Sequence, residues 1–148
     1  MKKAIIFIGI QAVGKSTFYR DNFSEFVHIN LDTLHTRNKE NKLLNECIAD
    51  EKSFVADNTN PQRKDREKYI TLARNAGYKV TGYYFRSSVS ESIERNSTRT
   101  GKAKVPDTAI ISTHAKLEIP SYNEGFDELY YVCIEKNKFI IKKWDDTK

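Results

Sequence analysis

The amino-acid sequence predicts an α/β fold built on a mainly parallel β-sheet. Segments rich in β-branched and aromatic residues alternate with segments of helical spacing, and this alternation is typical of βαβ units. An apolar run at the start of the chain leads directly into a glycine-containing loop, residues 9–16. No internal repeat, low-complexity linker or step in composition marks a second domain, so residues 1–148 are predicted to form one domain.

Composition and charge narrow the class of protein. The chain of 148 residues is 39% hydrophobic and 30% charged, which is typical of a globular protein. Membrane insertion is not expected, because no apolar run approaches the roughly 20 residues that span a bilayer. Two cysteines are too few for a disulfide framework and have no metal-ligand spacing, which favours a reducing cytoplasm. The net charge of +5 favours an anionic partner.

Five strand-like segments are predicted from their β-branched and aromatic residues. They are residues 4–8, 26–30, 53–57, 79–85 and 128–134. The first segment has a basic tip like that of a secretion signal, but it is short and has no cleavage site, so it is interpreted as a strand. A further strand-like run follows EKNK near the end of the chain, and the last two runs could form a C-terminal hairpin.

Two longer helices are predicted between these strands. In residues 61–77 the apolar positions recur at helical spacing, Pro61 lies near the start and Gly77 ends the pattern. Residues 31–51 are predicted to be helical as well, and their polar middle indicates a possible break.

The stretch GIQAVGKS, residues 9–16, matches the phosphate-binding pattern G-x-x-x-x-G-K-[ST]. A strand before it and a helix-like segment, KSTFYRDNF, after it give the context that the pattern requires and disfavour a chance glycine turn. Gly9 and Gly14 let the backbone approach phosphates, so that N–H groups face the negative charge. Lys15 is expected to reach the β- and γ-phosphates, and the Ser16 hydroxyl to ligate Mg²⁺. The sequence therefore predicts a site for ATP or another nucleoside triphosphate. Its expected contacts are Gly9, Gln11, Ala12, Val13, Gly14, Lys15, Ser16 and Thr17.

Candidates for the acceptor side follow predicted strands, because ligands of open α/β sheets bind at the carboxyl ends of the strands. Asp32 follows the second strand, where its carboxylate would accept the proton of an attacking hydroxyl. Its position fits a helix cap equally well. Asp57 ends the third strand and would hold substrate, or Mg²⁺ through water, unless DNTNP serves only as a turn and a helix start.

A basic stretch follows the fourth strand, after Ser87 or Ser88, either of which would cap a short helix. Its basic residues would close over a polyphosphate, and one guanidinium would stabilise charge in the transition state. A solvated helix face is the alternative reading of these residues, Arg95, Arg99, Lys102 and Lys104. The histidines show no ligand spacing and are not expected to form a metal site or a catalytic triad: His28, His35 and His114.

In order along the chain, these stretches resemble the kinase domain of the polynucleotide 5′-hydroxyl kinases, the phage and animal end-healing enzymes within the P-loop kinase group. The resemblance covers about residues 4–132. It rests on GIQAVGKST, VHINLDTL, VADNTNPQRKDREKYITLARNAGY, RNSTRTGKAKVPD and IPSYNEGFDEL. The first piece is common to many families, whereas DNTNP followed by a helix, and later EGFDE, are more particular.

The resemblance implies a three-layer P-loop NTPase fold with a lid segment, and ATP- and Mg²⁺-dependent phosphorylation of the 5′-hydroxyl end of DNA or RNA. It implies that Lys15 and Ser16 serve ATP and Mg²⁺, and that Asp32 is the general base. Arg99 best matches the lid arginine that contacts ATP, and Arg95 is the alternative. The residues that match a loop on the acceptor side are Asp57, Asn58 and Thr59.

One position departs from the family pattern. Where relatives typically read Asn-Arg-Asp, this chain has Leu31 before Asp32, so a basic residue expected to help hold the nucleic-acid backbone is missing. Arg37 and Arg63 are candidates to replace it. The departure keeps a second hypothesis open, a kinase for a small-molecule alcohol such as a nucleoside, sugar or antibiotic. A third hypothesis is a binding module in which ATP orders the lid without phosphoryl transfer.

Overall fold

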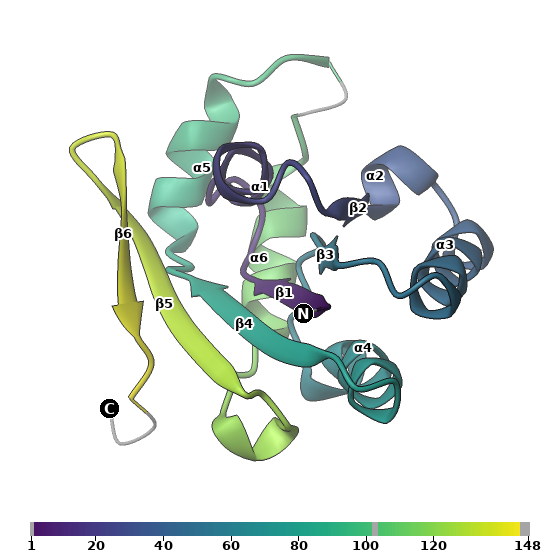
Figure 1. Ribbon diagram of the computed structural model, residues 1–148. Helices are drawn as coiled ribbons and strands as arrows, with labels where there is room; N and C mark the ends of the chain where they lie inside the picture. The colour runs from purple at the N-terminus through teal and green to yellow at the C-terminus, as the bar shows by residue number, and fades with distance from the viewer. Residues whose placement is uncertain (1, 102–103, 146–148) are drawn as a thin grey trace.

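A computed structural model describes residues 2–101 and 104–145 and contains a six-stranded sheet in the order β2-β3-β1-β4-β5-β6. All neighbouring strands are parallel except β5 and β6, which are antiparallel (Figure 1). The α/β prediction with a mainly parallel sheet is therefore confirmed. The strands are β1 (Lys3–Ile8), β2 (Val27–Ile29), β3 (Phe54–Ala56), β4 (Lys79–Phe85), β5 (Glu128–Glu135) and β6 (Lys138–Lys143).

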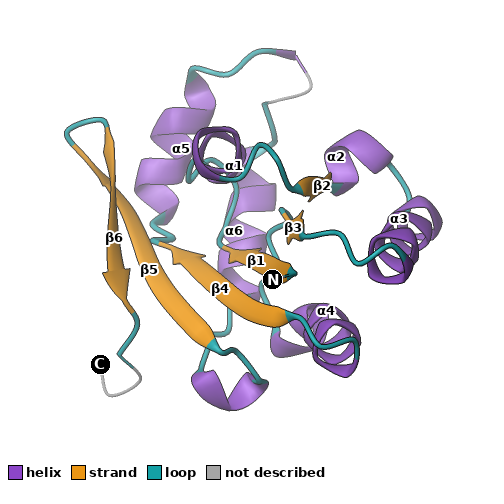
Figure 2. Cartoon of the chain, in the orientation of Figure 1, coloured by secondary structure: helices purple, strands orange, loops and turns teal. Residues whose placement is uncertain are grey.

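Helices cover both faces of this sheet, so that the described residues form three layers (Figure 2). On one face α1, α5 and α6 pack through Phe18, Ile93 and Ile110, and on the other face α3 and α4 pack through Leu44 and Tyr69. The helices are α1 (Lys15–Asn22), α2 (Leu31–Leu34), α3 (Arg37–Ala49), α4 (Arg63–Asn75), α5 (Val89–Ser97) and α6 (Asp107–Lys116), with a 3₁₀ turn, η2 (Tyr122–Glu124).

Strand β1 is buried on both faces, which explains its continuous apolar sequence. Ile5 and Phe7 belong to the core beneath α1, whereas Ile6 and Ile8 belong to the core beneath α3 and α4. Because the strand ends in the middle of the sheet, the loop that follows it emerges at the centre of the carboxyl edge. This placement sets the position of the candidate site.

The predicted break in residues 31–51 is confirmed at His35. Its φ of 71° ends α2, and Thr36 then caps α3 by accepting a hydrogen bond from the Lys39 amide at 3.2 Å. The predicted cap of α5 is also present, because the Ser88 hydroxyl accepts from the Glu91 amide. Local polar chemistry therefore sets several helix boundaries.

The C-terminal hairpin is confirmed, with its turn at Lys136 and Asn137, which have φ values of 50° and 62°. Helix α6 was not predicted, because its sequence DTAIISTHAK mixes β-branched and small residues without a clear polar face. Within the described ranges, no helix is both long and apolar enough to cross a membrane.

Candidate active site

The loop between β1 and α1 has the backbone conformation of a phosphate cradle. Ala12 and Gly14 are left-handed, with φ values of 62° and 91°, and Gly14 begins α1 without a side-chain cap. The first N–H groups of α1 lack intrahelical partners, so they are available to an anion. The Gly9 amide donates to the Thr59 carbonyl at 3.0 Å, which ties the start of the loop to the segment after β3.

Space around the two glycines is tight. A β-carbon at Gly9 would lie 3.1 Å from Cβ of Phe85, and one at Gly14 would lie 3.0 Å from ring carbons of Phe139. The Phe139 ring also packs edge-on against Phe18 of α1, with 5.1 Å between ring centroids. Strand β6 therefore supports the loop from outside, a contact that the sequence pattern did not reveal.

Lys15 lies along this loop and is partly buried. Its Nζ donates to the carbonyls of Gly9 at 2.6 Å and Ile10 at 2.8 Å. The pKa of Lys15 is lowered to about 8, mainly by burial and also by Arg99, while Asp57 and Asp32 act to raise it. A bound anion would compensate the buried ammonium, so the lysine fits a phosphate ligand.

Ser16 and Asp57 meet across the sheet edge. The Ser16 hydroxyl donates to Oδ2 of Asp57 at 2.9 Å, and the carboxylate is only 1% exposed. A P-loop hydroxyl beside a carboxylate at the end of the neighbouring strand provides oxygen ligands of the kind that Mg²⁺ prefers. Among the described residues, no group of three or more His, Cys, Asp or Glu side chains could hold a metal alone. The arrangement fits Mg²⁺ that also binds phosphate oxygens and water.

His28 of β2 contacts the same carboxylate. Its Nε2 lies 2.7 Å from Oδ2 of Asp57, and its ring stacks on Tyr19 with 4.0 Å between centroids. Sequence spacing offers no local sign of this contact, because the two residues are 29 positions apart and meet only through parallel pairing of β2 and β3. His28 is therefore a neighbour of the site that sequence reasoning missed.

Asp32 lies on the first turn of α2 and is exposed. Asn30, not Asp32, caps this helix, because its Oδ1 accepts from the Thr33 amide at 3.3 Å. The same Asn30 side chain donates to the Asp57 carbonyl at 2.5 Å. The Asp32 carboxylate is thus not used as the cap, and it lies near enough to affect the pKa of Lys15.

The rest of the acceptor loop is held by hydrogen bonds. Asn58 accepts from the Leu31 amide at 2.9 Å and donates to Glu40 at 2.9 Å and to the Tyr69 hydroxyl at 3.2 Å. Thr59 contributes its carbonyl to Gly9. Of the three residues expected to face an acceptor, Asn58 therefore has its amide group fully engaged within the protein.

The basic stretch approaches the loop from α5. Arg95 donates to the Ala12 carbonyl at 3.4 Å, and Arg99, just beyond the end of α5, affects the pKa of Lys15. Lys104 is exposed, and Lys102 lies outside the described residues. The two arginines therefore lie near the phosphate loop.

The other predicted loop contacts differ in exposure. Ala12 and Val13 are buried, whereas Thr17 is exposed and accepts a hydrogen bond from Arg20. Gln11 donates to Thr113 of α6 at 3.0 Å, and its Oε1 is buried without a partner among the described residues. Helix α6 thus contacts the phosphate loop.

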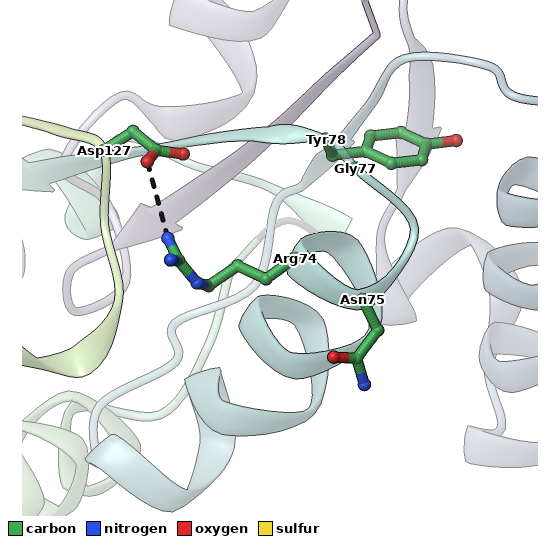
Figure 3. Close-up of a pocket in the computed structure, with 5 residues that line it drawn as sticks. All are labelled: Arg74, Asn75, Gly77, Tyr78 and Asp127. Atoms are coloured by element: carbon green, nitrogen blue, oxygen red, sulfur yellow. Dashed lines mark hydrogen bonds and ion pairs between the residues drawn. The ribbon is translucent and has the colours of Figure 1, made fainter.

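A shallow hollow elsewhere does not belong to this site (Figure 3). Gly77 and Tyr78, which line it, precede β4, so the hollow lies at the amino ends of the parallel strands. Arg74 and Asp127 form an ion pair of 3.4 Å across it. Because the phosphate loop lies at the carboxyl ends, this hollow lies at the opposite edge of the sheet from it.

Comparison with known proteins identifies a family and several relatives. A family model described as an AAA domain matches residues 36–120. A bifunctional polynucleotide phosphatase/kinase from Schizosaccharomyces pombe is 26% identical over 99% of this chain, and a protein assigned to the same class in Acanthamoeba polyphaga mimivirus is 30% identical over 99%. The chain spans 36% of the length of each of these two relatives.

One further relative and one solved structure are also similar to this chain. An L-seryl-tRNA(Sec) kinase from Methanococcus maripaludis is 22% identical over 83% of this chain and 55% of its own length. The crystal structure of Chaetomium thermophilum Kti12 in complex with ADP-AlF3 superposes with a TM-score of 0.69 at 16% identity, covering 88% of each chain. The superposition shows a shared fold.

Proposed function

The chain belongs to the AAA domain family and has a P-loop kinase fold, and from this premise we propose that it is an ATP- and Mg²⁺-dependent kinase that phosphorylates the 5′-hydroxyl end of DNA or RNA. One observation carries the proposal. Asp57, Asp32 and Arg99 come from three separate segments, and all of them act electrostatically on the buried ammonium of Lys15. These candidate groups for a phosphate donor and a hydroxyl acceptor are therefore close enough to the Lys15 ammonium to act on it electrostatically, which supports a shared site at the carboxyl edge.

On the donor side, backbone N–H groups of the loop and the Lys15 ammonium would bind the β- and γ-phosphates. Ser16 and Asp57 would hold Mg²⁺, which offsets charge on the polyphosphate when bound. Arg99, with Arg95 as the alternative, would contact the transferring phosphoryl group from the lid side.

On the acceptor side, the exposed carboxylate of Asp32 would take the proton of the attacking hydroxyl. The hydroxyl oxygen forms a bond to the γ-phosphorus while the bond from that phosphorus to the β–γ bridging oxygen breaks, and ADP leaves. Asn30 fixes α2 as its cap, so the carboxylate keeps a defined position at the end of β2.

Nucleic acid is proposed as the acceptor from the relatives and from charge. The names of the first two relatives state a polynucleotide kinase activity, and this chain carries a net charge of +5. Arg63 and Lys64, at the start of α4 just beyond the acceptor loop, are exposed and could contact a phosphate backbone. Binding to an oligonucleotide should then weaken steeply with salt.

A second candidate is a kinase for a small-molecule alcohol, and Leu31 favours it. This apolar residue stands beside Asp32, where the polynucleotide kinases place a basic residue, so the entrance to the acceptor side has less positive charge. Turnover of a small alcohol that does not change with salt would support this candidate.

The deciding experiment incubates the purified protein with γ-labelled ATP, Mg²⁺ and a 5′-hydroxyl oligonucleotide, beside the Lys15→Ala variant. Label on the oligonucleotide that disappears in the variant is the expected result. Intact ATP binding without label on the oligonucleotide would overturn the proposed acceptor. A panel of nucleosides, sugars and aminoglycosides would then distinguish a small-molecule kinase from a module that binds ATP without transfer.

A further inference from the structure

Glu40 of α3 is a buried carboxylate outside the group of residues described for the reaction. Its side chain is 0% exposed, and four donors surround it. Oε1 accepts from Arg37 at 3.0 Å and from Lys68, and Oε2 accepts from Asn58 and from the Tyr69 hydroxyl, both at 2.9 Å. Burial acts to raise the pKa of Glu40, but hydrogen bonds from Lys68 and Tyr69 outweigh it and lower the pKa below its usual value. The group is therefore ionised at neutral pH.

The hydrogen bonds of this cluster lead to the acceptor side. The amide nitrogen of Asn58 points to Glu40 and the Tyr69 hydroxyl, so its oxygen points the other way, to the Leu31 amide. If the Asn58 amide were turned over, its nitrogen would face the Leu31 N–H and its oxygen would face the carboxylate, and both contacts would be repulsive. Glu40 thus determines the orientation of the Asn58 side chain.

A gain in folding stability does not by itself explain the buried ionic cluster around Glu40. Replacing a buried ionic group by packed apolar side chains is often neutral or stabilising, because the charges lose their hydration. An apolar residue at position 40, however, would remove the carboxylate that accepts from the Asn58 amide nitrogen, and the Leu31 amide would lose that support for the orientation of Asn58. The specific consequence of the carboxylate is a fixed hydrogen bond at the backbone of Leu31.

We infer that Glu40 is a positioning residue, which acts through Asn58 to hold the start of α2 and so the carboxylate of Asp32 at its place of reaction. The inference rests on the proposed function, because it takes Asp32 as the base. A misplacement of about 1 Å in a reacting group can lower the rate by about a hundredfold. Loss of the hydrogen bond at Leu31, one residue before the base, is therefore expected to lower the rate of transfer.

The test uses charge exchange between the two side chains. Asn58→Asp keeps an oxygen for the Leu31 amide but places two carboxylates against each other. Adding Glu40→Gln returns an amide donor to the pair with the total charge of the wild type. Glu46→Gln, at an exposed position of the same helix, is the matched control. Each protein is assayed for kcat and for KM of ATP, and exchange of the Leu31 amide proton is followed by NMR.

For Asn58→Asp we expect kcat to fall by about 10- to 100-fold with KM for ATP within about twofold of the wild type, and faster exchange at Leu31. The double variant should recover kcat to within about fivefold of the wild type, and the control should match the wild type. If Asn58→Asp only lowers the melting temperature and leaves kcat and Leu31 exchange unchanged, the positioning role is wrong. Hydrogen exchange of the Leu31 amide can be measured without any phosphate acceptor, so it tests the positioning role by itself. If the wild-type protein transfers no phosphate to the oligonucleotide, the proposed function is overturned whatever the exchange result.

Discussion

The hydroxyl of Ser16 and the buried carboxylate of Asp57 are joined by a hydrogen bond of 2.9 Å, although 41 positions separate them in the sequence. The contact connects the first turn of α1 to the end of β3. Asn30 also donates a hydrogen bond to the Asp57 carbonyl. Asp57 therefore joins the donor side and the acceptor side of the site.

Asp57→Asn should raise the Mg²⁺ concentration needed for half-maximal activity by about tenfold or more, because an amide is a weaker ligand than a carboxylate. Its size is unchanged, so the fold should persist. The measurement is initial rate against Mg²⁺ concentration at saturating ATP. Asp21→Asn, at an exposed position of α1, serves as the control, and an identical Mg²⁺ dependence in both variants would contradict the assignment.

Asp32→Asn should lower kcat by about 10²- to 10⁴-fold, because the amide cannot take the proton of the acceptor hydroxyl. The dissociation constant for ATP should stay within about twofold of the wild type. Helix α2 should also persist, since Asn30 provides its cap. Single-turnover transfer and ATP titration test the two expectations, and a variant with wild-type kcat would remove Asp32 from the role of base.

Nucleotide affinity should depend on pH through Lys15. The lysine has a pKa of about 8 in the unliganded protein, and a bound polyphosphate raises that pKa. Below pH 8 the ammonium is charged both in the free protein and in the nucleotide complex. Above pH 8 the free protein has lost this proton, so binding requires uptake of a proton. Affinity should therefore fall as pH rises past 8, by up to about tenfold per pH unit. Calorimetry of nucleotide binding provides the measurement.

Lys15→Arg is the control for this pH dependence, because a guanidinium stays charged throughout the range. Its affinity should be lower but nearly constant between about pH 7.5 and about pH 9.5, a range that includes the lysine pKa of about 8. A wild-type affinity that is equally constant would show that Lys15 keeps its charge at pH 9.5 without a ligand.

Phe139→Ala should weaken nucleotide binding although Phe139 lies at the opposite end of the sequence from the phosphate loop. The ring packs on Phe18 and lies against Gly14, so its removal leaves a gap beneath the loop. We expect a loss of about 2 kcal/mol in unfolding free energy, less than for a fully buried ring. Chemical denaturation and ATP titration test this effect. Phe139→Leu should restore most of both quantities.

Arg66 and Glu124 form a buried ion pair of 2.8 Å, and Arg66 also donates to the carbonyls of Asn60, Pro61 and Glu118. Arg66→Met should cost about 3–5 kcal/mol in unfolding free energy, because the Glu124 carboxylate is left buried and unpaired. Arg63→Met, at an exposed position of the same helix, should change stability by less than about 0.5 kcal/mol. Equal losses in the two variants would contradict this account.

The strands and most helices were predictable because their signals are local. The strand segments and the helix of residues 61–77 follow from residue types and their spacing, and the possible break within residues 31–51 follows from its polar middle. Helix α6 was missed because neighbouring elements, through Ile110 in the core, stabilise a segment with weak intrinsic preference. The turn at Lys136 and Asn137 adopts positive φ values without a glycine, so its sequence is a weak signal for a hairpin turn.

The candidate site divides in the same way. The phosphate loop could be predicted from the sequence because its strand, its glycines, Lys15 and Ser16 are contiguous. The partners of Asp57 could not be predicted, since His28 and Ser16 reach it only after β2, β3 and β1 pair side by side. Nor does sequence spacing indicate that Glu40 orients Asn58 from a distance of 18 positions. Residue roles that depend on pairing between distant segments require the structure.

The proximity of Gly14 and Phe139 joins two segments that lie far apart in the sequence. The loop of residues 9–16 precedes β6, whose aromatic ring supports it, by more than a hundred residues along the chain. Contacts of such long sequence separation form late in folding, since the intervening chain must be ordered first. The phosphate loop therefore gains the support of Phe139 only when the β5–β6 hairpin has packed against it, so partly folded states without the hairpin lack that support.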